Sequence, residues 1–286
     1  MERKEILKLN VFAAQIRVDI LKMLTHIGYG HLGGSFSIAD LMAVLYGKQL
    51  KYDSKNPTWE DRDYVVLSKG HAGPALYCAL SNSGFFPKEQ LLTLNAGKTN
   101  LPSHPDRLKT IGVDATTGSL GQGTSQAAGI ATGLKKLHKD NYVYLIVGDG
   151  ELNEGQCWEA FQYIANYKLD NLIVIIDNNK RQLDGYTTDI MNPFDIAKKM
   201  EAFGFYTKTV KGNDIVKLDE TIEEFKNHKN SSLCIVLDSI KGQGVKYFED
   251  LEANHSVKFN NQEINDAAAN AITDLEAYIK NGGCNV

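Results

Sequence analysis

Residues 142–185 decide the fold of this chain, and they read YVYLIVGDGELNEGQCWEAFQYIANYKLDNLIVIIDNNKRQLDG. The runs 142–147 and 171–177 are apolar on both faces, which is typical of strands buried within a parallel sheet. Between them, residues 156–167 have the apolar spacing of a helix. This order predicts a unit of two parallel strands joined by a crossover helix.

The same alternation extends in both directions along the chain. Further strands are predicted at residues 64–67, 205–210 and 233–239. Helices are predicted at residues 5–26, 74–81, 88–94, 121–137, 193–203, 215–227 and 263–280, with Ser37 capping another helix that ends near Leu45. Residues 96–118 are expected to form a long irregular loop, and helix 121–137 is so rich in Ala and Gly that another element must pack closely on it.

These elements predict one α/β domain over residues 1–286, a parallel sheet with helices on both faces. Residues 245–286 are expected to be a C-terminal extension that ends in a helix. We find no internal repeat and no linker rich in Pro or Ser.

Composition excludes several classes of protein. The 286 residues include 31 basic and 35 acidic side chains, a net charge of −4, so no basic surface for nucleic acid is expected. The apolar runs are far shorter than the roughly 20 residues of a membrane span, and the N-terminus lacks the pattern of a signal peptide. Four widely spaced cysteines favour reduced thiols in a cytoplasm over disulfides or a zinc site.

Three polar segments follow the predicted strands, at the sheet edge where open parallel sheets bind ligands. Asp149 lies in the first, Asn179 in the second, and the third is residues 240–244. A carboxylate and an amide oxygen are hard ligands that suit Mg²⁺, and the neighbouring glycines let the backbone approach a phosphate. Either segment alone is more often a simple turn, but the two together at this spacing favour a binding site.

The histidines fall into two groups. His26, His138 and His228 lie near predicted helix C-termini and are interpreted as structural or solvated. His31, His71 and His104 occupy loops rich in Gly or Pro, where binding residues are common, and an imidazole suits proton transfer there. Residues 28–33 also match a dinucleotide-binding pattern, but they follow a helix instead of a strand, so we reject that interpretation.

The pair of Gly-Asp-Gly and Asn-Asn resembles the thiamine diphosphate motif, and a resemblance to the transketolase family extends over nearly the whole chain. The motifs that carry it occur in the family's order at residues 30–35, 67–72, 102–105, 116–123, 148–155 and 179–185. The resemblance covers only the family's N-terminal, diphosphate-binding domain. The chain therefore resembles the N-terminal subunit of a split transketolase, with the family's thiamine diphosphate-binding fold.

The resemblance implies thiamine diphosphate and Mg²⁺ as cofactors. The implied metal ligands are Asp149, Asn179 and the backbone carbonyl of Arg181. The other residues implied to line the cofactor are His71, Gly118, Ser119, Leu120, Gly150 and Leu183. His31, His104 and His255 are implied to be catalytic and to face the substrate, while Glu154 would reach across a subunit interface toward a glutamate of the partner.

In the reaction that the resemblance implies, a two-carbon ketol unit passes from a ketose to an aldose, and the sugars carry a phosphate or a sulfonate. The family's cofactor-activating glutamate lies in a second, pyrimidine-binding domain, so we expect an obligate C-terminal partner subunit in an α2β2 assembly. Residues 242–286 are too few for such a domain. Alternatives are a subunit resembling deoxyxylulose-phosphate synthase or the first component of a keto acid dehydrogenase, or a non-catalytic paralogue.

Overall fold

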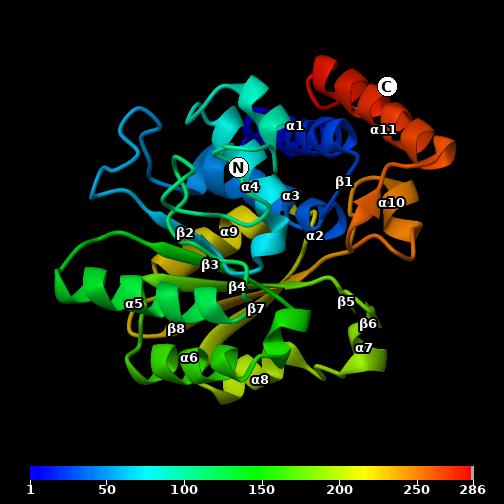
Figure 1. The fold of residues 1–286 in the computed structure, drawn as a ribbon. Coiled ribbons are helices and arrows are strands. Elements are labelled where there is room, and N and C mark those ends of the chain that lie inside the picture. The colour runs from blue at the N-terminus through cyan, green and yellow to red at the C-terminus, as the bar shows by residue number, and fades with distance from the viewer. Residues whose placement is uncertain (285–286) are drawn as a thin grey trace.

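A computed structural model describes residues 1–284, and its centre is a sheet of five parallel strands in the order β2-β3-β4-β8-β7 (Figure 1). The strands are β2 (Tyr64–Leu67), β3 (Val143–Gly148), β4 (Leu172–Asn178), β7 (Phe205–Lys211) and β8 (Ser232–Asp238). Gly148 pairs with Asp177, and Asn178 pairs with Asp238, so three strands end in register at one edge. The predicted parallel sheet is confirmed.

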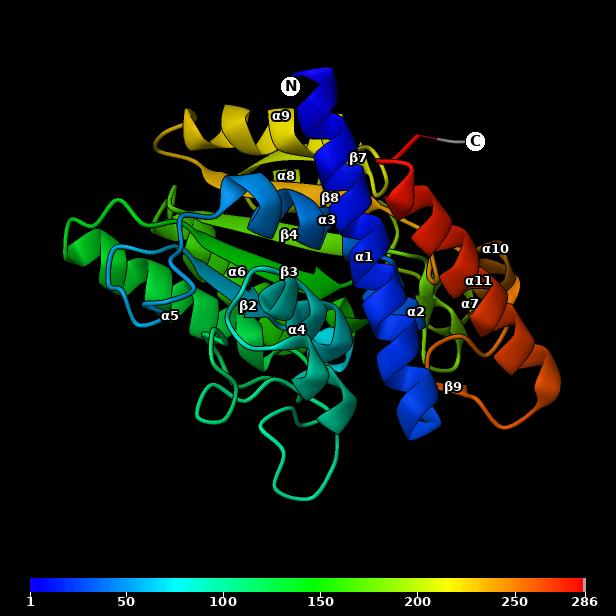
Figure 2. The ribbon, with the colours of Figure 1, turned by 90° about the horizontal axis from the view of Figure 1, so that it is seen from above.

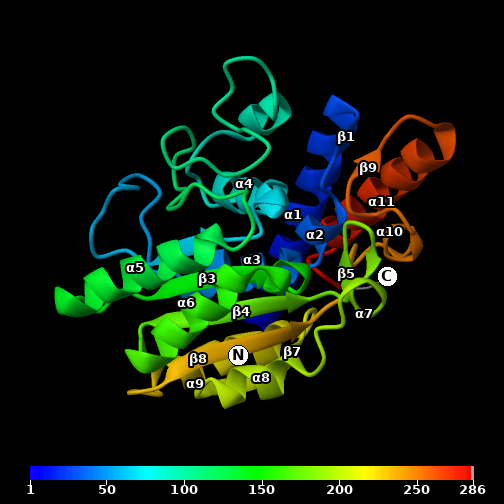
Figure 3. The ribbon, with the colours of Figure 1, turned by 60° about the horizontal axis from the view of Figure 1, so that its bottom comes forward.

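Helices cover both faces of this sheet (Figures 1 and 3). One layer contains α1 (Arg3–Ile27), α3 (Ala39–Val44), α4 (Gly73–Asn82) and α9 (Ile215–Lys226). The other contains α5 (Gln122–Lys136), α6 (Gly155–Asn166) and α8 (Ile196–Ala202). Because side chains alternate along a strand, β3 sends Ile146 into the first core and Val147 into the second. This two-sided burial is the reason that the strand sequences are apolar on both faces.

The two ends of the described chain lie together on one face. Helix α11 (Gln262–Lys280) packs along α1, as Figure 2 shows for the red and blue helices. The predicted domain span of 1–286 includes residues 285–286, which lie outside the described residues. Among the described helices, none combines the length and the apolar character needed to cross a membrane.

Two local predictions were wrong. Ser37 does not cap a helix: its backbone is itself helical (φ −59°, ψ −24°), it follows the short helix α2 (Gly33–Phe36), and its hydroxyl donates to Asp177 Oδ2. The predicted helix 193–203 begins only at Ile196. Asp195 caps it by accepting a hydrogen bond from the Lys198 N–H, and Phe194 has a positive φ of 52° that a helix does not allow.

Short elements that were not predicted from the sequence position the loops at the carboxyl edge. After β4 the chain forms a hairpin of β5 (Arg181–Gln182) and β6 (Gly185–Tyr186), then α7 (Thr187–Ile190) (Figure 1). Strand β1 (Tyr29–Gly30) pairs with β9 (Val257–Lys258), which follows α10 (Lys246–Asp250). The β1–β9 pairing holds the residue after β1, His31, close to the residues that precede β9.

Candidate active site

A pocket of about 380 Å³ opens beyond the carboxyl ends of β3 and β4. It collects residues from eight separate segments of the sequence. Its predicted site residues are His31, His71, His104, Gly118, Leu120, Asp149, Gly150, Glu154, Asn179, Arg181, Leu183 and His255. Ser119 lies between two of these residues and is exposed. The structure thus gathers almost all the predicted residues, from His31 to His255, around one cavity.

The oxygen-bearing side chains form the buried floor of this pocket. Asp149 follows β3, and its two carboxylate oxygens accept hydrogen bonds from the backbone N–H groups of Gly150 (2.8 Å) and Lys180 (2.6 Å). Asn179 follows β4, and its Oδ1 accepts a hydrogen bond from the Arg181 N–H at 3.1 Å. Burial raises the pKa of Asp149 to about 7, and the neighbouring Asp177 adds to the rise. A positive charge at this position would therefore be strongly favoured.

The donor set fits a hard divalent cation. Among the described residues, no three His, Cys, Asp or Glu side chains are arranged to hold a metal ion. A carboxylate, an amide oxygen and a backbone carbonyl are instead the ligands of Mg²⁺, which takes its remaining ligands from water and phosphate. The structural observation that supports this fit is that Asp149 and Asn179, 2% and 7% exposed, both line the pocket.

Glycines and a buried glutamate shape the side of the pocket around Gly118. A Cβ on Gly118 would lie 3.1 Å from the ring of His104, and Gly118 has φ +146°, so a side chain would be strained there. Glu151 holds this loop from behind, because its carboxylate accepts hydrogen bonds from the Gly121 N–H (2.8 Å) and the Ser68 hydroxyl (2.5 Å). Glu151 was not predicted as a site residue from the sequence, although it lies in the motif 148–155.

Four histidine rings line one wall. The centroid of the His31 ring lies 5.7 Å from that of His71, 5.8 Å from that of His104 and 5.4 Å from that of His255. Burial lowers the pKa of all four rings, and the charge of Lys69 further lowers the pKa of His71. For His255 the pKa falls to about 3. The rings are therefore neutral at pH 7, and a neutral ring has one nitrogen that donates a hydrogen bond and one that accepts.

Two lysines of this site were not predicted from the sequence. Lys241 is 3% exposed, and its ammonium donates to the carbonyls of Arg181 and Gln182, each at 3.2 Å, and lies 2.9 Å from His255 Nδ1. Burial lowers its pKa to about 8, against the opposing charge of Asp149. Lys69 is fully enclosed beside Asp177. Residues 240–244 follow β8 at the edge of the sheet where ligands bind. A lysine next to a glycine in this segment could have indicated Lys241 as a site residue.

The rim of the pocket is exposed and partly apolar. Leu183 lies at the β5–β6 turn with 68% of its surface exposed, and Glu154 is an exposed residue just before α6. Three more exposed apolar side chains, Ile190, Met191 and Phe194, follow on the same segment. Exposed apolar surface beside a polar pocket is typical of an interaction site.

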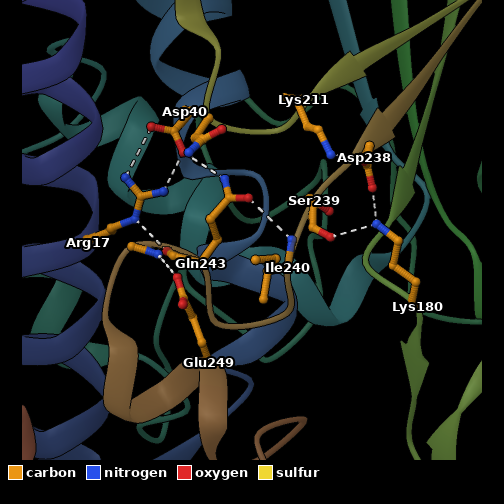
Figure 4. A pocket seen from close by; sticks show the side chains of 11 residues that line it. Arg17, Asp40, Lys180, Lys211, Asp238, Ser239, Ile240, Gln243 and Glu249 are labelled. Carbon is orange, nitrogen blue, oxygen red and sulfur yellow. Dashed lines mark hydrogen bonds and ion pairs between the residues drawn. The ribbon is translucent and has the colours of Figure 1, made fainter.

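Lys180 lines a second cavity, of about 490 Å³ (Figure 4). The ammonium of Lys180 pairs with Asp238 and donates to the Ser239 carbonyl at 3.1 Å, while Lys211 pairs with the other oxygen of Asp238. Lys180 has φ +64°, a left-handed conformation that costs about 1–2 kcal/mol for a residue other than glycine. Its anchored side chain keeps its N–H on Asp149.

Comparison with known proteins gives the same family as the motifs. The family model described as "Transketolase, thiamine diphosphate binding domain" matches residues 9–276. The 6-deoxy-6-sulfo-D-fructose transketolase subunit SqwG of Clostridium sp. (strain MSTE9) is 44% identical over 248 residues, which cover 86% of this chain and 90% of that protein. A subunit of the apulose-4-phosphate transketolase of Actinobacillus succinogenes is 39% identical over 220 residues, 77% of this chain and 79% of that protein.

The fold is also found in solved structures. The transketolase of Campylobacter jejuni superposes with a TM-score of 0.81 at 27% sequence identity. The superposition covers 99% of this chain but 49% of that one. This chain thus spans about half the length of the solved transketolase, whereas it spans most of the two subunits named above.

Proposed function

The chain belongs to the transketolase family, and we propose that it is the thiamine diphosphate-binding N-terminal subunit of a two-chain transketolase. The observation that carries this proposal is the single pocket that unites a buried oxygen donor set with four neutral histidines. With its partner, the chain would transfer a two-carbon ketol unit from a ketose to an aldose. Thiamine diphosphate supplies the electron sink for such a transfer when it is bound.

The residues of this chain would bind and position the cofactor and the sugar. Asp149, Asn179 and the carbonyl of Arg181 would hold Mg²⁺, and the ammonium of Lys241, which lines the same pocket, would meet a diphosphate oxygen. Gly118, Ser119, Leu120, Gly150, Leu183 and His71 would surround the cofactor. The buried floor excludes water, which strengthens each of these electrostatic contacts.

The histidines would handle the protons of the substrate. His31 and His255 would take the proton of the donor hydroxyl, because both rings are neutral and close together. His104 would donate a hydrogen bond to the oxygen derived from the substrate carbonyl. Glu154, exposed on the rim, would meet the activating glutamate of the partner.

A partner chain with the pyrimidine-binding domain completes the proposal. Both named relatives are called subunits, and the exposed Leu183 on the pocket lining begins a segment, 183–194, that exposes further apolar residues. We propose an α2β2 assembly in a cytoplasm, where the buried free thiols of Cys78, Cys157 and Cys234 would stay reduced. The substrates would be sugar phosphates or sugar sulfonates, the two classes that appear in the names of the relatives.

The test uses the complex isolated with its partner from the native host. Asp149→Ala should abolish Mg²⁺-dependent binding of thiamine diphosphate, measured by isothermal titration calorimetry, because the carboxylate is the only charged ligand in the set. Asp184→Ala, which removes an exposed carboxylate of the β5–β6 turn, should leave binding unchanged.

The same preparation shows whether ketol transfer needs one chain or both. Ketol transfer should require both chains. Full transfer by this chain alone would refute the two-chain proposal. A complex that binds the cofactor but transfers no ketol unit from any phosphorylated or sulfonated ketose would favour the non-catalytic paralogue.

A further inference from the structure

Asp177 is a fully buried carboxylate that lies behind the pocket wall and joins four segments of the chain. It is 0% exposed, at the end of β4, two residues before Asn179. Its Oδ2 accepts hydrogen bonds from the Lys69 ammonium (2.6 Å) and the Ser37 hydroxyl (2.7 Å). Its Oδ1 accepts a hydrogen bond from the Ser239 hydroxyl. A buried charge held by several donors marks a position where the surrounding geometry is fixed.

The same carboxylate also fixes the amide of Asn179. The Asn179 Nδ2 donates to Asp177 Oδ2 at 2.8 Å, while its Oδ1 accepts from the Arg181 N–H at 3.1 Å. An ionised carboxylate can only accept, so it must face the nitrogen end of an amide and cannot face the oxygen end. The backbone N–H of Arg181 selects the oxygen end in the same way. Both contacts therefore turn the amide oxygen away from Asp177.

We propose that Asp177 is a positioning residue that fixes the Asn179 amide with its oxygen toward the cation site. The Lys69 ammonium pairs with this carboxylate in the core, 2.6 Å from Oδ2. The proposal rests on the proposed function only in taking Mg²⁺ as the cation. Without the constraint from Asp177, the amide could present its NH₂ group to the site, which repels a metal ion and removes one hard ligand.

Lys69 connects Asp177 to a segment beside the histidine wall. Its ammonium is 1% exposed and also donates to the Gly34 carbonyl at 2.6 Å, in the segment that follows His31. The ion pair therefore ties the metal loop to the loop that carries a catalytic histidine. Such contacts behind a ligand commonly change metal affinity by about 10–100-fold when they are lost.

The experiment compares Asp177→Asn with Ser239→Ala in the two-chain complex. Mg²⁺ affinity is measured by calorimetry at fixed thiamine diphosphate, and stability by thermal unfolding. An asparagine at 177 can offer either end of its amide, so Mg²⁺ should bind at least about tenfold more weakly. Ser239→Ala removes a different hydrogen bond from the same carboxylate, so it should lower stability while Mg²⁺ affinity stays within about twofold. Equal Mg²⁺ affinities in Asp177→Asn and the wild type would overturn the proposal.

A swapped variant tests orientation directly. In Asp177→Asn with Asn179→Asp, the hydrogen bond is reversed in direction, and the side chain at 179 offers only oxygens. Mg²⁺ affinity should recover relative to Asp177→Asn. Failure to recover in a folded complex would show that Asp177 acts through overall stability instead of through the amide.

The wild type supplies a readout that needs no variant. The side-chain amide protons of Asn179 should exchange slowly with solvent by NMR, both with and without Mg²⁺, because the carboxylate holds them. Rapid exchange would contradict the proposal. If the wild-type complex binds neither Mg²⁺ nor thiamine diphosphate, the proposed function is wrong. The exchange rate of the Asn179 amide protons then still tests whether Asp177 fixes the amide.

Discussion

At the scale of the residue, the pocket buries positively and negatively charged side chains close to one another. Lys241 and Lys69 are buried cations next to the histidine wall, and their charges lower the pKa of the rings that burial has already lowered. The carboxylates of Asp149 and Asp177 are also buried, and Asp177 pairs with Lys69. Neutral histidines, ammonium groups and buried carboxylates thus share one small pocket, and the ammonium groups favour an anionic cofactor there.

The lowered pKa of His255 predicts a loss of stability in acid. The folded chain keeps this ring neutral down to a pKa of about 3, whereas the unfolded chain protonates it near its ordinary value of 6.5. The unfolded state therefore binds more protons below pH 6.5, and the free energy of unfolding falls as the pH drops from 6.5 toward 3. After allowing for solvent screening of a partly exposed ring, we expect His255 to contribute about 1 kcal/mol of this loss at pH 5.

Urea unfolding of the chain at pH 7 and pH 5 measures this contribution. The decrease in the free energy of unfolding from pH 7 to pH 5 should be about 1 kcal/mol smaller in His255→Gln than in the wild type. His138→Gln changes an exposed histidine after α5 and should leave the loss unchanged. The same loss in all three proteins would show that the ring at 255 titrates normally.

At the scale of the element, helix α5 is fitted to the strand next to it through one glycine. A Cβ on Gly123 would lie 2.7 Å from the Cα of Ser68, which is backbone that cannot move aside. The Ser68 hydroxyl also donates to Glu151, which holds the loop before α5. The expectation that something packs closely on this Ala- and Gly-rich helix is confirmed.

We therefore expect Gly123→Ala to destabilise the chain by about 1–3 kcal/mol, because overpacking forces the helix away from β2. Gly129→Ala is the matched control in the same helix, since nothing lies within 4 Å of its added Cβ. That change should be neutral or stabilising by up to about 1 kcal/mol, because alanine favours the helix. Thermal unfolding of both variants measures this difference in stability. A Gly123→Ala protein as stable as Gly129→Ala would mean that the helix shifts at no cost.

The sequence predicted those elements whose pattern is local. The strands and most helices follow from apolar periodicity, and the parallel sheet follows from their alternation. The hairpin β5–β6 and the β1–β9 pair were missed because two-residue strands carry no periodicity. Ser37 was misread as a cap because its hydroxyl donates to Asp177, which is 140 residues away in the sequence. Lys69 and Lys241 were missed for the same reason: their partners are defined by the fold and not by neighbours in the sequence.

At the scale of the whole molecule, exposed apolar side chains of the described residues occur near the pocket and also at the opposite end of the strands. The segment 183–194 begins with Leu183 on the pocket lining and exposes Leu183, Ile190, Met191 and Phe194, the last with 75% of its surface in solvent. At the far, amino-terminal end of the strands, Leu137 is also exposed, at the end of α5. If the pocket is completed by a partner chain, the first surface should be buried in the complex and the second should remain in solvent.

This difference predicts opposite results for two similar substitutions. Met191→Asp places a charge on the surface beside the pocket, and it should weaken assembly with the partner subunit by at least about tenfold, because an unpaired charge must then be desolvated in the interface. Leu137→Asp places the same charge at the end of another helix, and assembly should be unchanged. Both side chains are more than half exposed, so the thermal unfolding of the isolated chain should hardly change in either variant. Analytical ultracentrifugation of each variant mixed with the partner measures assembly, and a thiamine diphosphate titration of the same mixtures should show cofactor binding falling together with it. Equal assembly of the two variants would place the partner on another face and would leave the apolar residues of segment 183–194 without a role in completing the active site.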